Sequence, residues 1–463
     1  MALEYESLDQ LYLQGVPCGP ILGIEIEEKA EAHGFMRITF QIDESLENAL
    51  LYELKSRQAA SLIGKQGCLF TGLLDRIAFF KSEDVRKAEL TFLTATCLLD
   101  AKKKFRSFQD TSMTYRALLD LILSNYPGAA YIFSGADAPI GRLLVQYQET
   151  DWAFLKRVFS EVHCALAPSS SAALPRFYVG VPDAEAKISL RLEGLEKDER
   201  EVRLFSSLDI PEPAFTDHEF VSGERTELFA RLSYQGRALS VSALSAKLVK
   251  SRLEWRLKAR GAEAILQYPI YPISLVGIAL EGSIRAVRGN QVQIHMDIDD
   301  PYQNNDCYWF PYATMSASLN GTGWYYMPEV GDRVRVEFPT KHAEDALVIN
   351  SASIYEVSGG GEDSMSTPST KYLTNTAGQK LSMGEGSVVL TAANAAGVSM
   401  DGGGNLSIWA AGNIAFCAAN SITVQGENIT IHAAEAVKAA SDQGSGMEMK
   451  SNIDLTGAEV KIN

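Results

Sequence analysis

Short apolar pairs, each split by one intervening residue, return at a nearly fixed interval over the last eighty-odd residues of the chain. Successive units lie mostly seven or eight residues apart. Apolar residues two positions apart share one face of an extended strand, and the connecting Gly, Asn, Ala, Ser and Asp residues favour corners. This pattern predicts a repeated strand-and-corner unit, as in a β-helix or β-prism. The eleven pairs are Leu381/Met383, Val388/Leu390, Val398/Met400, Leu406/Ile408, Ile414/Phe416, Ile422/Val424, Ile429/Ile431, Val437/Ala439, Met447/Met449, Ile453/Leu455 and Val460/Ile462.

The number of repeat units indicates how many chains build the predicted β-helix or β-prism. One chain that closed a three-sided coil alone would give fewer than about four coils with both ends open. Three chains wound together would supply about 33 strands, or about eleven layers of roughly 4.7 Å and a rod of about 50 Å. We therefore predict an intertwined homotrimer whose apolar pairs face the axis. A monomeric β-solenoid is the alternative, whereas the regular period disfavours a disordered tail.

The preceding part of the chain predicts mainly strands, with one helical stretch. A helix is expected at about residues 115–123, with Asp110 or Thr111 as its N-cap, and a second helix after Thr150. Residues 167–182 are rich in Ser, Ala and Pro and predict a linker that ends in a strand. Residues 276–355 predict about five strands, including a hairpin across residues 288–290, which suits a small OB-type barrel.

Three motifs together resemble a known family. They are Phe105–Asp110 (FRSFQD), Gln146–Arg157 (QYQETDWAFLKR) and Trp324–Asp332 (WYYMPEVGD). The chain resembles VgrG, the spike of type VI secretion systems, and the related hub-spike proteins of contractile phage tails. In that family the first two segments determine the fold of the hub, and the third is similar to the OB-domain signature, here Trp324, Pro328, Gly331 and Asp332.

The repeat and the resemblance together predict a mainly β, multidomain protein with a minor α component. The hub would consist of two β-barrel-like domains with an α/β insertion, followed by an OB-fold neck and the trimeric needle. The expected boundaries are 1–100 for the first hub barrel, 101–166 for the α/β segment, 167–275 for the second hub barrel, 276–355 for the OB fold, 356–377 for a Gly/Ser-rich linker and 378–463 for the β-helix.

The resemblance also implies a function and a set of partners. The protein would be the central spike of a contractile injection machine, capping the inner tube and puncturing the target envelope. Expected partners are the inner tube and baseplate proteins at the hub, a PAAR-type tip protein at the needle end and effector cargo, with transient contact to the target membrane. The expected platform for the tip consists of Val460, Ile462 and Asn463.

The charge, the cysteines and the first residues of the chain limit its expected partners and location. The chain has 42 Lys and Arg against 58 Asp and Glu, a formal charge of −16, which argues against nucleic-acid binding through charge. Its six scattered cysteines predict reduced, mostly buried thiols of a protein made in the cytoplasm. The acidic start MALEYESLDQ lacks the features of a signal peptide, so we expect cytoplasmic assembly and export as part of a particle.

Sequence patterns typical of chemistry are not found, so we expect neither a cofactor nor an enzyme. The six histidines form no HxH or HExxH spacing, and the run Asp297–Asp300 lacks the glycine and distal glutamate of a calcium loop. Two alternatives are weighed against the spike. A glycan-binding adhesin would need exposed aromatic residues on the rod, where only Tyr372, Trp409 and Phe416 occur. A cell-wall hydrolase would need clustered carboxylates or a metal set.

Overall fold

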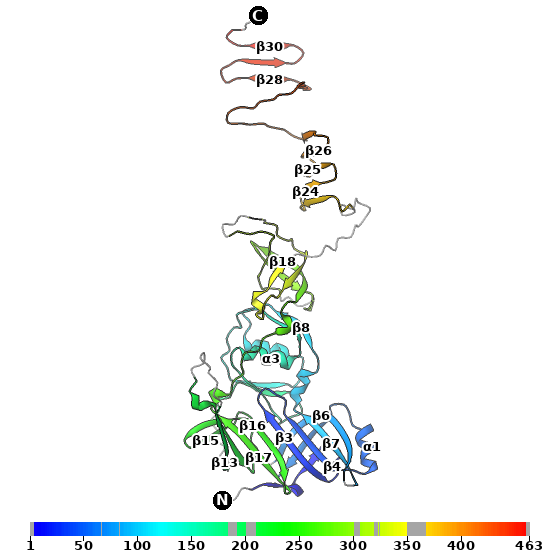
Figure 1. Ribbon diagram of the computed structural model, residues 1–463, viewed down its shortest axis with the longest axis vertical. Coiled ribbons are helices and arrows are strands. Elements are labelled where there is room, and N and C mark those ends of the chain that lie inside the picture. Colours follow the sequence, from blue (N-terminus) through cyan, green and yellow to red (C-terminus); the bar gives the residue numbers. More distant parts are fainter. Residues whose placement is uncertain are drawn as a thin grey trace. The chain divides into compact units, whose positions relative to one another are not determined.

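The computed structural model divides into two compact units, residues 1–354 and 355–463. It describes residues 4–65, 67–82, 84–183, 192–200, 210–300, 306–318, 323, 325–349 and 367–459. The first unit contains a large curled sheet, an α/β segment and a small barrel, and the second unit contains flat strand ladders (Figure 1). The prediction of a mainly β, multidomain protein is confirmed.

One twelve-stranded sheet contains the strands that were expected to form two separate hub barrels (Figure 1). The two halves are joined because β3 pairs with β4 on one edge and with β16 on the other. A single hydrophobic cluster with Ile26, Phe92 and Trp255 runs through both halves. Along the sheet the strands are β13 (Leu192–Arg200), β14 (Thr216–Ser222), β17 (Arg252–Arg260), β16 (Arg237–Val249), β3 (Ile21–Lys29), β4 (Phe35–Gln41), β7 (Val85–Leu93), β6 (Gly67–Ser82), β5 (Ala59–Gly64) and β2 (Tyr12–Gln14), with β1 (Glu6–Ser7) and β15 (Arg231–Tyr234) beside it.

The α/β segment has a core of its own, built on two amphipathic helices. Leu118, Phe154 and Phe159 are fully buried in it. Leu166, Phe177 and Val179 belong to this core. The segment predicted as a linker ends in a strand, β12, as expected, but it also contains most of a second strand, β11. The elements are η2 (Ala95–Asp100), β8 (Lys104–Phe108), α2 (Tyr115–Leu123), β9 (Ala130–Phe133), β10 (Leu144–Glu149), α3 (Asp151–Ser160), β11 (Leu166–Pro168) and β12 (Arg176–Val179).

Each α-helix begins at a residue whose side chain accepts a hydrogen bond from a backbone amide of the first turn. Thr150 caps α3 by accepting from the Ala153 amide at 3.2 Å, as predicted. The N-cap of α2 is Thr114, so the prediction of Asp110 or Thr111 is wrong, because the Asp110 carboxylate instead accepts from Ser112 in the preceding turn. The helix α1 (Glu44–Tyr52), capped by Asp43, was not predicted.

The OB-type barrel is a five-stranded sheet whose ends meet. Its order is β20-β19-β18-β21-β22, and Tyr312, just after β20, bridges to Val348 in β22. The predicted hairpin between β18 and β19 is confirmed, and Gly289 in its turn has a φ of 57°, which glycine adopts without strain. The strands are β18 (Ala279–Arg288), β19 (Gln291–Met296), β20 (Phe310–Pro311), β21 (Arg333–Glu337) and β22 (Leu347–Ile349), and short 3₁₀ turns are η1 (Leu8–Gln10), η3 (Glu212–Phe215), η4 (Ala262–Ala264), η5 (Ile273–Leu275) and η6 (Ala343–Asp345).

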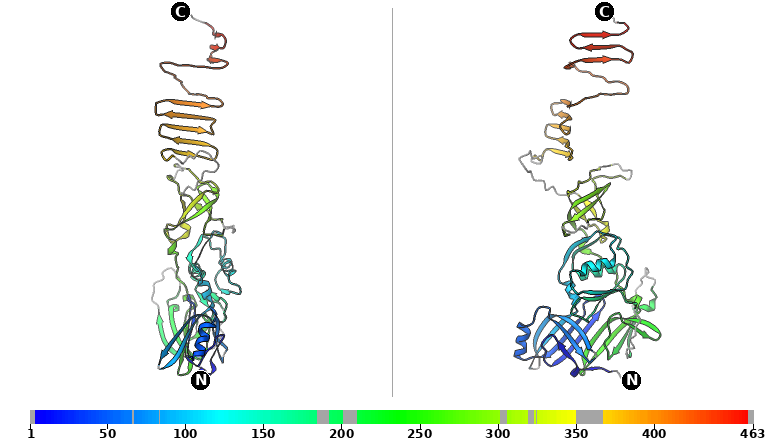
Figure 2. Two further views of the ribbon diagram at one scale, coloured as in Figure 1. Left: turned by 90° about the vertical axis from the view of Figure 1, so that its right-hand side faces the viewer. Right: turned by 180° about the vertical axis from the view of Figure 1, so that it is seen from behind.

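The second unit consists of two antiparallel ladders (Figure 2). Each strand from β24 onward is one unit of the sequence repeat, and neighbouring units within a ladder pair with each other in the same chain. Between the ladders, residues 411–436 contain no assigned strand. The first ladder comprises β23 (Lys371–Thr374), β24 (Gln379–Met383), β25 (Ser387–Ala392), β26 (Ala396–Asp401) and β27 (Leu406–Ala410), and the second comprises β28 (Val437–Ala440), β29 (Gly446–Met449) and β30 (Ile453–Thr456).

Candidate assembly surfaces

The apolar pairs of the repeat line up on one face of each ladder. In the first ladder, Leu390 pairs with Val398 and Val398 pairs with Ile408. The opposite face presents Ser399 against Ser407 instead. Because paired residues of neighbouring strands project to the same side of a sheet, each ladder has one apolar and one mostly polar face. Other aligned pairs include Met400/Leu406, Met447/Leu455 and Met449/Ile453.

In a single chain this apolar face is uncovered. Leu406 is 61% exposed, and Ile453 is 67% exposed. Contiguous apolar patches of this kind are rare on soluble monomers and indicate an interaction surface. The expected inward-facing residues of the middle segment are also exposed and lie outside any strand; they are Ile414, Phe416, Ile422, Val424, Ile429 and Ile431. The expected tip platform of Val460, Ile462 and Asn463 lies outside the described residues.

A second contact region is the joint between the α/β segment and the OB barrel. The two-stranded sheet β8-β10 contributes to two cores at once: Phe108 and Leu144 pack with the helices, while Leu143, just before β10, and Val145 pack with the barrel. Successive side chains of a strand point to opposite faces, so one strand can join two cores.

Hydrogen bonds also connect the α/β segment to the barrel at this joint. The buried Asp299 carboxylate accepts from the Ser107 amide at 2.5 Å and from the Ser107 hydroxyl at 2.6 Å. Gln109 donates through Nε2 to the Ile294 carbonyl at 2.9 Å. Two residues of the first family motif therefore bind the barrel directly. Sequence reasoning missed this joint, because the 192 residues between Ser107 and Asp299 hide the contact.

The second family motif encloses a buried carboxylate. Asp151, fully buried, accepts from Lys104 Nζ at 2.6 Å and from Arg106 Nη2 at 2.7 Å. Tyr126 Oη and Gln146 Nε2 also donate to it, at 2.7 and 3.1 Å. Buried charges are tolerated only with such pairing. Asp151 of the QETD segment thus holds β8, β10 and α3 together.

The OB signature residues shape one turn. Gly331, with a φ of 98°, and Asp332 immediately precede β21, as predicted. The Asp332 carboxylate accepts from the Glu329 amide at 2.8 Å, and Pro328 lies half-buried just before it. Trp324 lies outside the described residues.

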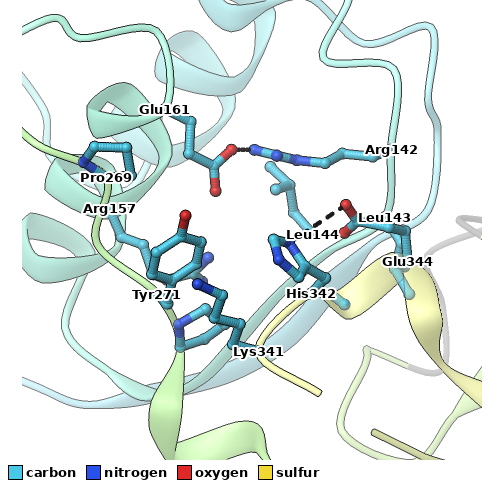
Figure 3. A pocket seen from close by; sticks show the side chains of 12 residues that line it. Arg142, Leu143, Leu144, Arg157, Glu161, Pro269, Tyr271, Lys341, His342 and Glu344 are labelled. Carbon is cyan, nitrogen blue, oxygen red and sulfur yellow. Dashed lines mark ion pairs between the residues drawn. The ribbon is translucent and has the colours of Figure 1, made fainter. Parts of the chain in front are cut away.

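A cavity of about 180 Å³ lies where α3, the segment before β18 and η6 meet (Figure 3). Polar contacts link several of its side chains: Arg142 forms an ion pair with Glu161, and His342 Nδ1 lies 3.8 Å from a carboxylate oxygen of Glu344. Lys341 lies over the Tyr271 ring, 3.6 Å from its centroid. Mutual pairing of this kind suits a polar joint between packed elements better than a reactive site.

The structure also places the other residues considered as metal ligands or buried thiols. Among the described residues, no three His, Cys, Asp or Glu side chains are placed to hold a metal ion. In the acidic run Asp297–Asp300, the Asp297 carboxylate accepts a hydrogen bond from the Arg333 guanidinium. None of the six cysteines, all of which the structure describes, forms a disulfide, but the prediction that most are buried is wrong: Cys68, Cys307 and Cys417 are exposed and the others half-buried. In the described part of the chain, no helix is both long and apolar enough to span a bilayer.

Two buried carboxyls of the hub are electrostatically perturbed. Burial raises the pKa of Glu28 to about 7, against the lowering effect of Arg225. Burial likewise raises the pKa of Glu31 to about 7, although the Leu166 amide donates to its carboxylate. Both lie at the β3–β4 turn, where the large sheet contacts the α/β segment.

Comparisons with known proteins agree with this architecture. Residues 283–352 match the family described as the type VI secretion system/phage-baseplate injector OB domain. No curated protein sequence matches the chain. The E. coli c3393 protein, described as a type VI secretion component structurally similar to T4 bacteriophage tail proteins gp27 and gp5, superposes with a TM-score of 0.52 and 15% identity over 73% of this chain and 98% of its own.

A second structure, the lidded Francisella PdpA–VgrG complex, gives a TM-score of 0.51 and 10% identity over 84% of this chain and 76% of the other. The chain thus shares its fold with a type VI secretion component and with a VgrG-containing complex. The resemblance to VgrG-type and phage-tail hub-spike proteins, indicated by the sequence motifs, is confirmed. At these identities the likeness establishes the fold alone.

Proposed function

We propose that three copies of this chain form the central spike of a contractile injection machine. The observation that carries the proposal is the apolar face of the two needle ladders, which a single chain leaves uncovered. Three such faces turned toward a common axis would bury the apolar ladders and leave the polar faces in water. The choice of three copies follows from the count of repeat units and from the family resemblance.

The uncovered face is large enough to drive assembly. Ten apolar residues of the ladder strands are exposed by 36% to 67% in one chain. Full burial of such a side chain contributes about 1.5–3 kcal/mol, so covering the remaining half contributes roughly 1 kcal/mol each. Three chains together would gain on the order of 30 kcal/mol, which equals or exceeds the cost of about 8–30 kcal/mol for the two association steps that a trimer needs. The residues are Leu373, Met383, Leu390, Met400, Leu406, Ile408, Met447, Met449, Ile453 and Leu455.

The mechanical consequence follows from the strand arrangement. Eleven layers spaced by roughly 4.7 Å would make a rod of about 50 Å, longer than the roughly 30 Å hydrocarbon core of a bilayer. Main-chain hydrogen bonds along the rod would resist axial load. The hub would then cap the inner tube and meet the baseplate, and the needle end would carry a tip protein and cargo, as the family resemblance implies.

An adhesin is supported less well by the same surface. Tyr372 and Trp409 lie on the polar face of the first ladder, where a glycan could reach them. The Trp409 ring, however, lies against Gly397 in the neighbouring strand, since a Cβ added there would come within 2.3 Å of it. It is therefore partly used in packing within the ladder. A hydrolase is tested by the loss of turbidity of purified peptidoglycan, for which we expect no effect.

Light scattering tests the trimer directly. The mass in solution is expected to be three times the 50.6 kDa of one chain. Ile408→Asp would place three carboxylates around the axis, and each unpaired buried charge costs several kcal/mol, so this variant should dissociate. Ser407→Asp, its neighbour on the polar face of β27, should remain trimeric. A monomeric wild-type protein, or equal dissociation of the two variants, would contradict the proposal.

A further inference from the structure

The cavity where α3, the segment before β18 and η6 meet contains donor groups that no described residue pairs. Arg157 comes from α3, Tyr271 from the segment before β18, and Lys341 from the segment before η6. Figure 3 shows the ends of these side chains around the same space. The volume of about 180 Å³ is smaller than the roughly 300–1,000 Å³ of pockets for drug-sized ligands, so a ligand here has only a few non-hydrogen atoms.

Arg157 is the most deeply buried of the three, with a side chain only 3% exposed. Its Nε and Nη2 each donate to an oxygen of Glu149 at 2.8 Å, and Nη2 also donates to the Val145 carbonyl at 2.7 Å. Nη1, at the remaining corner of the planar guanidinium, donates to no atom of the described residues. Buried N–H groups are nearly always paired, so Nη1 points to an acceptor that comes from outside the chain.

Lys341 adds a charge to this unpaired donor. Its Nζ lies 3.6 Å from the centroid of the Tyr271 ring, and this cation–π contact holds the ammonium group at the cavity. In the described part of the chain, neither Lys341 Nζ nor the Tyr271 hydroxyl has a hydrogen-bond partner, and Lys341 forms no ion pair. A water molecule would satisfy Nη1 of Arg157 but would leave the charge of Lys341 unbalanced.

The other charges of the lining are already committed. Glu149 balances Arg157, and Glu161 pairs with Arg142. The side chain of Glu344 is 38% exposed beside His342, so water screens its charge. One cation, Lys341, therefore remains to be balanced, which favours a ligand with a single negative charge.

We propose that this cavity binds a small monocarboxylate. One carboxylate oxygen accepts from Arg157 Nη1, and the other accepts from Lys341 Nζ. Charge-assisted hydrogen bonds of this kind are the strong ones, and a carboxylate has two oxygens to meet two cations. The hydrocarbon part of the ligand lies against the apolar lining, which includes Leu143 and Pro269.

Such a ligand would connect two parts of the first unit. Arg157 belongs to the α/β segment and Lys341 to the OB barrel, so one bound anion joins them across the cavity. Occupancy should therefore oppose local opening of the joint. The site lies within a single chain, so a failure of the proposed trimer would leave it unaffected.

Saturation-transfer NMR of the full chain tests binding with butyrate, at constant ionic strength. Butyramide has the same shape without the charge and should give no signal, whereas butyrate should bind with a Kd of about 1 mM. Inorganic phosphate is the second comparison and should bind more weakly than butyrate. Hydrogen exchange of peptides from α3 and from residues 339–345 should slow about tenfold at a butyrate concentration of about ten times Kd.

Variants locate the site. Lys341→Met should weaken butyrate binding at least about tenfold, because it removes one charge-assisted hydrogen bond. Lys55→Met removes the same charge from an exposed residue of the hub and should bind as wild type does. Tyr271→Phe keeps the ring below Lys341 and should weaken binding about two- to tenfold. Equal signals from butyrate and butyramide, tighter binding of phosphate, or unchanged binding in Lys341→Met would each overturn the proposal.

Discussion

Replacing Asp151 with asparagine tests the idea that the QETD motif acts as a structural brace. The substitution keeps the side-chain shape and removes the charge that faces Lys104 and Arg106, whose side chains are 24% and 22% exposed. Removing one partner of a buried ion pair costs about 3–5 kcal/mol. Because both cations keep some contact with water, we expect the lower end, about 3 kcal/mol, in the free energy of local opening.

Hydrogen exchange read by mass spectrometry is the assay, with peptides from α3 and β8 as reporters. A loss of about 3 kcal/mol corresponds to roughly a hundredfold faster exchange where opening is local. Asp137→Asn is the matched control, because the ion pair of Asp137 with Arg116 is 3.7 Å long and the two side chains are 37% and 49% exposed. An asparagine oxygen can still accept the 3.1 Å bond from the Arg116 amide. Exchange in Asp151→Asn within about twofold of wild type, or equal to that of the control, would refute the reasoning.

Two further predictions concern the first unit, residues 1–354. The raised pKa values of Glu28 and Glu31, about 7 each, lie above the usual value of 4.5, so the stability they contribute is present at acidic pH and lost as pH rises through 7. The melting temperature of the hub should therefore be higher at pH 5.5 than at pH 8, and Glu31→Gln should flatten this dependence; an unchanged slope would contradict it. Asp299→Ala should cost about 3 kcal/mol, from two bonds to a buried carboxylate at about 1.5–3 kcal/mol each, and should raise exchange in β8 and β19. Asp297→Ala, which removes a partly exposed pair with Arg333, should cost less than about 1 kcal/mol, and equal effects would refute the role of the joint.

The needle register could be predicted from the sequence because its period is two. A slip of one residue would move every apolar side chain to the other face, so the alternation alone fixes the face. The pairing partner could not be predicted, because an eight-residue unit fits both a hairpin and a corner. The deciding feature is backbone conformation at turns such as Gly404 and Gly444, which composition alone does not reveal.

The helices of the hub show the same division between local and long-range information. Thr150 was predicted as a cap because the cap, the acidic next residue and the apolar face are consecutive. For α2 the capping residues Asp110, Thr111 and Thr114 compete within one turn, and the turn formed by Asp110 and Ser112 leaves Thr114 as the cap. The continuity of the twelve-stranded sheet depends on β3 meeting β16, about two hundred residues away, which no local pattern encodes.

The family motifs lie at positions that would carry mechanical load and that also stabilise the fold. Under the proposed function, force on the needle must pass through the OB barrel into the hub. Apolar contact of Leu143 and Val145 with the barrel core resists separation but tolerates sliding, because burial is not directional. The bonds from Ser107 to Asp299 and from Gln109 to Ile294 have fixed geometry and so oppose sliding. A segment that supplies both kinds of contact from two adjacent strands is where a spike would need its most constrained sequence.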